Sequence, residues 1–524
     1  MLFKIISVVG SLTFVSRILG YTRDLLIARV IGAGIISDCF FVAFKLPNLF
    51  RRIFGEGAMN AAFIPVVSGI RTKQGKNEAD KFFSNIFSIL LVFLFIFLVL
   101  IEVFMPLLIS LIAPGFTSNS DKFSLSVDLS RFSFPFVLFI CLTSLLGAYL
   151  NTLGKFASMA VTPVILNLAL IFVLLIFFND SDKIEISSTL SISISFAGII
   201  QVIWMYYNLK KEKSNLFLNF SFKKLLVKDP YIKKFLKLLL PAIIGNGAYQ
   251  LNLLIDMILA STLPDGSISY LYYADRVNQL PLGVLGIAIS TALLPILSTQ
   301  IKNKQTKYAN ESISRSIKFG ILFSIPACFG ILIFSNEIIS LLFFRGAFES
   351  TDVQLTGSAL IALCCGLPAF IMIKILVVPF FANEDTKTPI RISLICMIIN
   401  LILNLILIRN YHHVGLAIST SISAWVNTLL LLYLLKIKNN YSLDFSVLKV
   451  LVKVLMASSF MSFFVIKIFE LLKSNLVGNS FFNTNFTLIM CIIFGIIIYT
   501  ISLYILGTNE LEVDKWKNQK KNQN

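Results

Sequence analysis

Charged side chains occur inside two long apolar segments near the start of the chain. A charge near the centre of a bilayer costs on the order of 2.5–3.5 kcal/mol, so such a side chain usually faces a cavity, pairs with another charge or extends to the membrane surface. The nine charges of these segments are therefore candidates for a polar site inside a membrane. The segments, at 5–31 and 35–69, contain Arg17, Arg23, Asp24, Arg29, Asp38, Lys45, Arg51, Arg52 and Glu56.

Arginines in this setting suit the binding of a phosphate or diphosphate. A guanidinium cannot lose its charge and offers a planar pair of donors for two phosphate oxygens. Arg17 and Asp24 are close to two helical turns apart and share a helix face, whereas Arg23 lies about 240° around the helix from Arg17. Gly20 between the arginines permits a bend that could turn both toward one cavity.

A second charged pair, Asp275-Arg276, occurs in the apolar segment 268–299. Three or four arginines from both halves of the chain, facing one cleft, would form a receptor for a diphosphate. In the alternative interpretation the arginines extend to the membrane surface and acidic neighbours neutralise them. That interpretation applies to Arg29, Arg51 and Arg52, with Asp24 and Asp38 as the neighbours.

The elements that must position these side chains are membrane-spanning helices. The chain has 524 residues and a mean hydropathy of +0.85, and only 14% of its residues are charged, whereas soluble domains have about 25%. Only helices and closed barrels satisfy their backbone groups in a bilayer, and apolar runs such as 86–112 are too long for barrel strands. The sequence therefore predicts an all-α polytopic membrane protein with about fourteen membrane-spanning helices.

The charge of the connections predicts the orientation of the chain. The net charge is +18, yet no stretch is long and polar enough for a nucleic-acid-binding domain, so membrane lipids or an anion inside the membrane are the expected partners. Basic connections stay on the cytoplasmic side, and here they alternate with acidic or nearly neutral ones. The basic connections lie at 71–81, 210–237, 302–318 and 515–521. Both termini are therefore expected in the cytoplasm.

Short patterns recur in the same order in both halves of the chain. The residues around Pro65 recur around Pro295, and Thr-Pro at Pro163 recurs at Pro389, although similar loop chemistry is an alternative cause. A repeat of this kind predicts two pseudo-symmetric six-helix lobes around a central cavity that binds the substrate. The expected parts are an N-lobe at 1–215, a basic cytoplasmic linker at 216–237, a C-lobe at 238–440, two further helices at 441–507 and a cytoplasmic tail at 508–524.

Several motifs together resemble the MurJ (MviN) family of lipid II flippases of bacterial peptidoglycan synthesis, within the multidrug/oligosaccharidyl-lipid/polysaccharide exporter superfamily. The motifs are SRILG at 16–20, Arg23-Asp24, GAG at 32–34, DCFFVAFKLPNLFRR at 38–52, Glu56-Gly57 and YYADR at 272–276. The resemblance covers nearly the whole chain. It implies fourteen helices and a multi-pass protein of the bacterial inner membrane, with a groove for the polyprenyl tail in 441–507.

The resemblance also implies roles for individual residues. Arginines of the first, second and eighth helices line a cationic cavity that takes the diphosphate and sugar headgroup of lipid II. The implied substrate-binding residues are Arg17, Arg23, Arg51, Arg276, Asp38 and Asn48, and the implied gate or cavity residues are Asp24, Arg52 and Glu56. The implied cycle is alternating access that carries the lipid from the cytoplasmic to the outer leaflet.

The energy source is less well defined by the residues. Gly154-Lys155 is followed by Phe156, so the chain lacks a phosphate-binding loop for ATP, and no catalytic residues or enzymatic activity are expected. The membrane potential favours export of negative charge by about 2.3 kcal/mol per charge per 100 mV. Asp256 and Asp385 are candidate ligands for a coupling Na⁺. Asp385 alternatively lies in a solvated turn, and intramembrane acids also serve as proton relays or ion-pair partners.

Two other functions would suit parts of the pattern. An exporter of other polyprenyl-diphosphate oligosaccharides or of drugs would share the lobes, but it should have fewer arginines in its cavity. A membrane scaffold without transport activity would leave the buried charges unexplained. The cell wall synthesis machinery is a candidate partner of a lipid II flippase.

Overall fold

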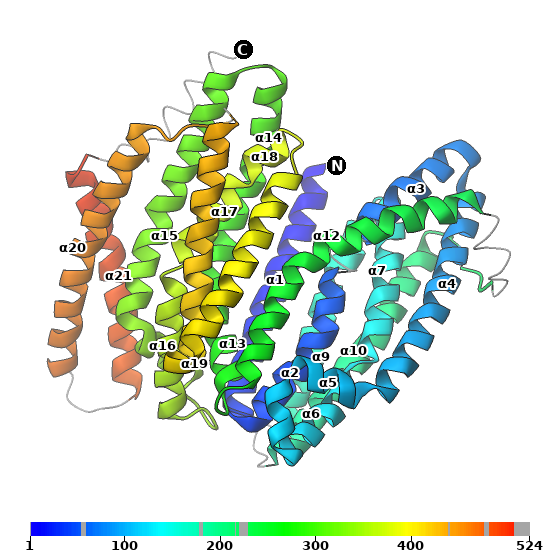
Figure 1. The fold of residues 1–524 in the computed structure, drawn as a ribbon, viewed down its shortest axis with the longest axis horizontal. Coiled ribbons are helices and arrows are strands. Elements are labelled where there is room, and N and C mark those ends of the chain that lie inside the picture. The colour runs from blue at the N-terminus through cyan, green and yellow to red at the C-terminus, as the bar shows by residue number, and fades with distance from the viewer. Residues whose placement is uncertain are drawn as a thin grey trace. The chain divides into compact units, whose positions relative to one another are not determined.

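The computed structural model describes residues 2–53, 59–177, 182–214, 216–219, 229–438, 441–475 and 481–507, and these residues form helices joined by short connections, without a strand. The chain divides into two compact units (Figure 1). Unit 1 comprises Met1–Ser269 and Arg345–Glu349, and unit 2 comprises Tyr270–Phe344 and Ser350–Asn524. The all-α class predicted from the sequence is confirmed.

Unit 1 is built around helices that pack in pairs, with α1 against α9, α2 against α6, and α7 against α3 and α10. Stacked aromatic rings fill its core, and the ring centroids of Phe83 and Tyr149 are 4.3 Å apart. Its helices are α1 (Leu2–Val30), α2 (Ile35–Phe50), α3 (Met59–Gln74), α4 (Lys76–Val103), α5 (Met105–Ile112), the 3-10 helix η2 (Pro114–Ser118), α6 (Ser120–Ser133), α7 (Phe136–Thr152), α8 (Phe156–Ala160), α9 (Thr162–Ile176), α10 (Lys183–Lys211) and α12 (Pro230–Ser261).

Unit 2 is organised around α15, which is kinked at Phe334 and packs against α14, α16, α17, α20 and α21. The hydroxyl of Tyr499 on α21 donates to the carbonyl oxygen of Leu322 on α15 at 2.6 Å, deep in this packing. The helices of the unit are α13 (Ser267–Pro281, which begins in unit 1), the π turn η3 (Leu282–Gly286), α14 (Ile287–Lys302), α15 (Thr306–Phe343), α16 (Ser350–Cys364), α17 (Leu367–Leu376), α18 (Val378–Ala382), α19 (Lys387–Ile437), α20 (Phe445–Asn475) and α21 (Phe481–Ile505).

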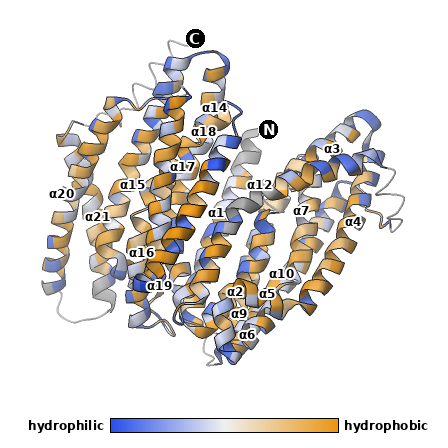
Figure 2. Ribbon diagram, viewed as in Figure 1, coloured by the Kyte–Doolittle hydropathy of each residue, from blue (hydrophilic) through white to orange (hydrophobic). Residues whose placement is uncertain are grey.

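Ten helical segments among the described residues are long and apolar enough to cross a membrane. Figure 2 shows hydrophobic residues along most of the length of α4, one of the ten. The charged helix α1 and the 16-residue helices α2 and α3 are outside this set. The 51-residue α19 counts once, although a kink at His412 divides it into two predicted spans. The chain is therefore a multi-pass membrane protein, and the number fourteen stays a prediction.

Candidate functional site

Arg23 is the most deeply buried of the predicted substrate-binding arginines, with 5% of its surface exposed. Its Nε donates to Oδ1 of Asp24 at 3.0 Å and its Nη2 to the same oxygen at 2.7 Å. Its Nη1 donates to Oδ1 of Asn167 on α9 at 3.0 Å. The guanidinium also lies 5.2 Å from the ring centroid of Phe44 on α2. Side chains from α1, α2 and α9 thus fix the direction of this cation.

Asn167 is a site residue that the sequence analysis missed. It carries the one side-chain amide in the apolar run of α9. Its Nδ2 donates to the carbonyl oxygen of Ser16 at 3.0 Å, and its Oδ1 accepts from Nη1 of Arg23. Its amide lies close to Gly20 of α1, where a Cβ would be 3.4 Å from Nδ2 of Asn167. α1 continues as one helix through Gly20, so this glycine lies at the point where Asn167 of α9 meets α1.

The other predicted cationic residues of unit 1 are less buried. Arg17 is exposed on α1. Arg51 is half-buried just after α2, and its Nε donates to Oδ1 of Asn48 at 2.9 Å, so these two predicted site residues act together. Arg52 is half-buried beside it, and Glu56 lies outside the described residues.

Asp38 occupies a buried polar cluster at the start of α2, with 1% of its surface exposed. Its Oδ2 accepts from the N–H of Gly266 at 2.7 Å, and its Oδ1 accepts from the N–H of Ser269 at 2.9 Å and from the Ser269 hydroxyl at 2.6 Å. Asp38 therefore caps the beginning of α13, where helix N–H groups have no partner within the helix. This carboxylate is a link between elements in the described structure.

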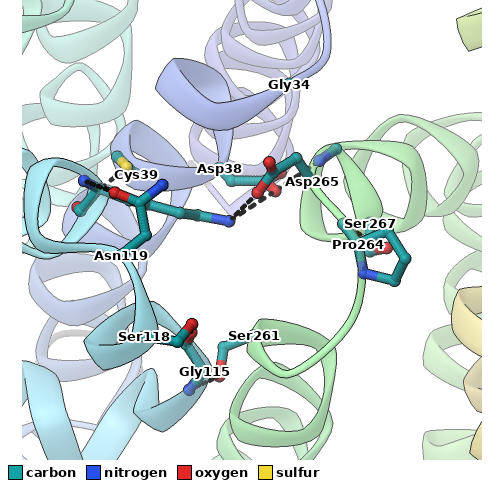
Figure 3. Close-up of polar contacts among 12 residues, drawn as sticks. Gly34, Asp38, Cys39, Gly115, Ser118, Asn119, Ser261, Pro264, Asp265 and Ser267 are labelled. Atoms are coloured by element: carbon teal, nitrogen blue, oxygen red, sulfur yellow. Dashed lines mark hydrogen bonds and ion pairs between the residues drawn. The ribbon is translucent and has the colours of Figure 1, made fainter.

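Lys122 on α6 completes this group, which we call the Asp38 cluster: Asp38, Lys122, Asp265, Gly266 and Ser269. The Lys122 Nζ lies 3.8 Å from Oδ2 of Asp38 and 2.6 Å from Oδ1 of Asp265 (Figure 3). It also lies 4.1 Å from the centroid of the Phe116 ring. The lysine is buried although its partner Asp265 is half exposed, so the ion pair reaches from the protein interior to its surface.

Close backbone approaches surround the Asp38 cluster. Gly115 of η2 lies against the end of α12, where an added Cβ would be 2.0 Å from the carbonyl oxygen of Ser261. Gly32, with φ of +81°, lies against Ala347, where an added Cβ would be 2.3 Å from the carbonyl oxygen. The N–H of Ala347 donates to the carbonyl oxygen of Arg29 at 2.8 Å. Side chains larger than hydrogen would push these segments apart.

Arg276 is the predicted cationic residue of unit 2. Its Nη2 donates to the Tyr272 hydroxyl at 2.8 Å, and its guanidinium lies 4.8 Å from the centroid of the same ring. Tyr273 is fully buried against Phe343, with ring centroids 5.0 Å apart, and anchors this turn of α13 in unit 2. Arg17, Arg23 and Arg51 belong to unit 1, so their convergence with Arg276 on one cavity stays a prediction.

The two candidate Na⁺ ligands differ in setting. Asp256 is half-buried on α12. Asp385 lies in the turn before α19, where it accepts from the N–H of Thr388 at 3.0 Å and from the Lys438 Nζ at 2.5 Å. The hydrogen bonds from Lys438 and Thr388 hold the pKa of the Asp385 carboxyl well below its usual range. Among the described residues, no three His, Cys, Asp or Glu side chains come together as a metal site.

Known proteins similar to this chain form a consistent group. A family profile described as Lipid II flippase MurJ matches residues 27–487. A probable lipid II flippase MurJ of Rickettsia prowazekii (strain Madrid E) is 41% identical over 426 residues, which cover 81% of this chain and 82% of that protein.

Solved structures agree with the sequence matches. The structure of a lipid II flippase MurJ in an inward closed conformation aligns with a TM-score of 0.79 at 29% identity, covering 95% of this chain and 98% of that one. An inward-facing multidrug resistance MATE family transporter of the MOP superfamily aligns with a TM-score of 0.65 at 13% identity over 82% and 97% of the chains, and this likeness concerns the fold alone. By the extent of the profile match and the identity to these relatives, the chain belongs to the MurJ family of lipid II flippases.

Proposed function

We propose that this chain carries lipid II from the cytoplasmic to the outer leaflet of the bacterial inner membrane by alternating access. The family supports this function, and one structural observation carries it: the buried guanidinium of Arg23, held by three helices. A buried cation whose direction is fixed in advance loses little freedom when it binds an anion. It therefore suits the diphosphate of a polyprenyl lipid.

Asp24 acts in this proposal as a substitute for the substrate anion. Its Oδ1 accepts from Nε and Nη2 of Arg23, the pair of donors that a phosphate would use. A diphosphate carries more negative charge than one carboxylate and can replace it at these donors, while Asn167 keeps its bond to Nη1. Between transport cycles Asp24 keeps the buried charge paired, which avoids the cost of an isolated ion.

Further headgroup contacts are proposed for arginines that a neighbouring side chain also holds in place. The guanidinium of Arg276 donates to the Tyr272 hydroxyl and lies over the same ring, and the guanidinium of Arg51 donates to Asn48. Arg17, about one and two-thirds turns before Arg23 on α1, is exposed and suits contact with the more polar part of the headgroup. Arg52, Asp24 and Glu56 remain proposed gate or cavity residues.

The Asp38 cluster is proposed as a gate on the outer side of the membrane. The connections that meet there follow α1, α5 and α12, and the positive-inside pattern places them outside, with both termini in the cytoplasm. Opening on that side requires the bonds from Gly266 and Ser269 to Asp38 to break. We therefore propose that Asp38 belongs to the gate rather than to the headgroup contacts.

The membrane potential is the proposed driving force, because it is negative inside and favours outward movement of the diphosphate by about 2.3 kcal/mol per charge per 100 mV. Coupling to Na⁺ through Asp256 is the alternative, whereas Asp385 is already paired with Lys438. Reconstituted transport, measured at a fixed potential with and without a sodium gradient, distinguishes the two. Enzymes of cell wall synthesis that use lipid II outside the membrane are proposed partners.

The test of the function is complementation of a host depleted of its lipid II flippase. The wild-type chain should restore the appearance of lipid II in the outer leaflet, and Arg23→Ala should lower it by at least tenfold while inserting normally. Arg391→Ala removes an exposed arginine and is the matched control. Outer-leaflet lipid II that does not depend on the wild-type chain would refute the function, and full transport by Arg23→Ala would refute the role of this arginine.

A further inference from the structure

A pocket of about 500 Å³ lies in unit 2, and none of the candidate site residues described above lines it. Its walls are the first three turns of α15 and residues 442–446 at the start of α20. The lining includes three cations, Lys307, Arg315 and Lys318, and two acids, Glu311 and Asp444. In the predicted topology both walls belong to connections on the cytoplasmic side.

Hydrogen bonds hold the two walls of this pocket together. The Ser314 hydroxyl on α15 and the Tyr441 hydroxyl are 2.9 Å apart, and both residues are buried. Asp444 accepts from the hydroxyl of Ser446 at 2.6 Å and from its N–H at 3.3 Å, which fixes the first turn of α20. Since α15 and α20 also pack along their length, the pocket is a built feature of unit 2.

The charges of the pocket favour an anion. Each acid is already engaged: Glu311 lies 3.8 Å from Arg315, and Asp444 accepts from Ser446. The hydrogen bonds from Ser446, with the charge of Lys318, lower the pKa of the Asp444 carboxyl. Lys449 adds positive charge beside the pocket, with its Nζ 5.1 Å from the ring centroid of the lining residue Phe445.

An apolar surface begins directly at this charged pocket. Phe445 lines the pocket and is 67% exposed, and Leu448, Val452 and Met456 follow it on the same exposed face of α20. On α15 the exposed Phe319 lies one turn beyond Arg315. Both helices are apolar enough to span a membrane, so these side chains lie beside acyl chains while the cations lie at the height of the headgroups.

We propose that this pocket binds the headgroup of an anionic glycerophospholipid of the cytoplasmic leaflet. Its phosphate lies among Lys307, Arg315 and Lys318, and one acyl chain lies along Phe445, Leu448 and Val452. A basic pocket between spanning helices on the cytoplasmic side is the chemistry that such headgroups select. The exposed apolar row argues against a free anion, which would gain nothing from it. The site is separate from the one proposed for lipid II.

The test uses the purified full-length chain and native mass spectrometry during titration with phosphatidylglycerol. Lys307→Gln combined with Lys318→Gln should weaken binding about 25-fold, because each basic residue near an anionic headgroup contributes about fivefold. The matched control removes the same charge from the far end of α20, as Lys467→Gln with Lys473→Gln, and should bind as the wild type does. Phosphatidylcholine with the same acyl chains should bind at least tenfold more weakly than phosphatidylglycerol.

Three results would overturn the proposal. The first is unchanged affinity for phosphatidylglycerol in the Lys307→Gln, Lys318→Gln protein. The second is equal affinity for phosphatidylcholine, which would mean that charge does not select the lipid. The third is displacement of phosphatidylglycerol by inorganic phosphate at equal concentration, which would mean that the pocket takes a free anion and that the apolar row has no part in binding.

Discussion

Asp38 and Asp385 make the same kinds of hydrogen bond and ion pair in two different settings. Each carboxylate accepts from an N–H and a hydroxyl in the first turn of a helix, and each pairs with one lysine. Asp385 caps the helix that follows it, three residues away, whereas Asp38 caps a helix that begins more than two hundred residues later. The side chain of Asp385 is 23% exposed, whereas that of Asp38 is 2% exposed.

The difference shows that the same set of hydrogen bonds can either cap a helix near the surface or hold buried elements of the fold together. The bonds from Thr388 to Asp385 form whenever this turn forms, and the pair with Lys438, at the far end of α19, is partly exposed to water. The Asp38 group exists only while α2, α6 and the segment before α13 are together. Because Asp38 is buried, its removal leaves the N–H groups of Gly266 and Ser269 unsatisfied. Its bonds can therefore report on, and stabilise, one arrangement of the protein.

Asp38→Ala should have the largest effect of the changes that separate these two groups. The substitution leaves the N–H groups of Gly266 and Ser269 without their acceptor in a buried setting and leaves Asp265 as the one acid paired with Lys122, which should cost about 3–5 kcal/mol. Thermal unfolding in detergent measures the loss, and labelling of a single cysteine introduced near Asp265 measures opening at that end. Asp38→Asn, which keeps one acceptor oxygen, should fall between Asp38→Ala and the wild type. Equal stability of the alanine variant and the wild type would contradict the interpretation that Asp38 holds α2 and the segment before α13 together.

Lys122→Met should have a smaller effect, since it tests the cation while keeping an aliphatic side chain against Phe116. Asp38 retains its three hydrogen bonds, and Asp265 is exposed enough to be hydrated, so we expect a loss of about 1–2 kcal/mol. The same thermal unfolding measurement applies, with Lys155→Met as the control for an exposed ion pair. A loss as large as that of Asp38→Ala would mean that the ion pair, not the cap of α13, holds the cluster together.

The sequence indicated the fold class and the residues on α1 and α2, because bilayer thickness sets the length of apolar segments and the charged motifs from Ser16 to Glu56 are specific. It could not indicate the partners of Asp38, since Gly266 and Ser269 contribute backbone groups from the far side of the chain. Every residue except proline has a backbone N–H group, so the residue type does not indicate which of these groups Asp38 binds.

Lys122 and Asn167 were missed for two different physical reasons. Residues 120–130 are too polar for a hydropathy pattern to assign to a span, yet α6 begins at Ser120 and continues with α7 as one segment of 33 residues. Lys122 therefore counted as part of a connection. Asn167 is uncharged, so the pattern of charged residues does not indicate it. A lone amide in the apolar run of α9 is itself a signal, because a polar group there needs a partner.

Asp385→Asn should have the smallest effect, and it sharpens the comparison from the opposite side. The amide can still accept from Thr388, and the lost pair with Lys438 is 41% exposed at the lysine, so stability should fall by less than about 1 kcal/mol. High salt should reduce even that difference, because exposed pairs are screened, while the cost of Asp38→Ala should stay nearly constant. Thermal unfolding at low and high salt measures both. A salt-independent loss of several kcal/mol in Asp385→Asn would mean that the exposed pair with Lys438 contributes as much stability as the buried bonds of Asp38, and the distinction between the two carboxylates would fail.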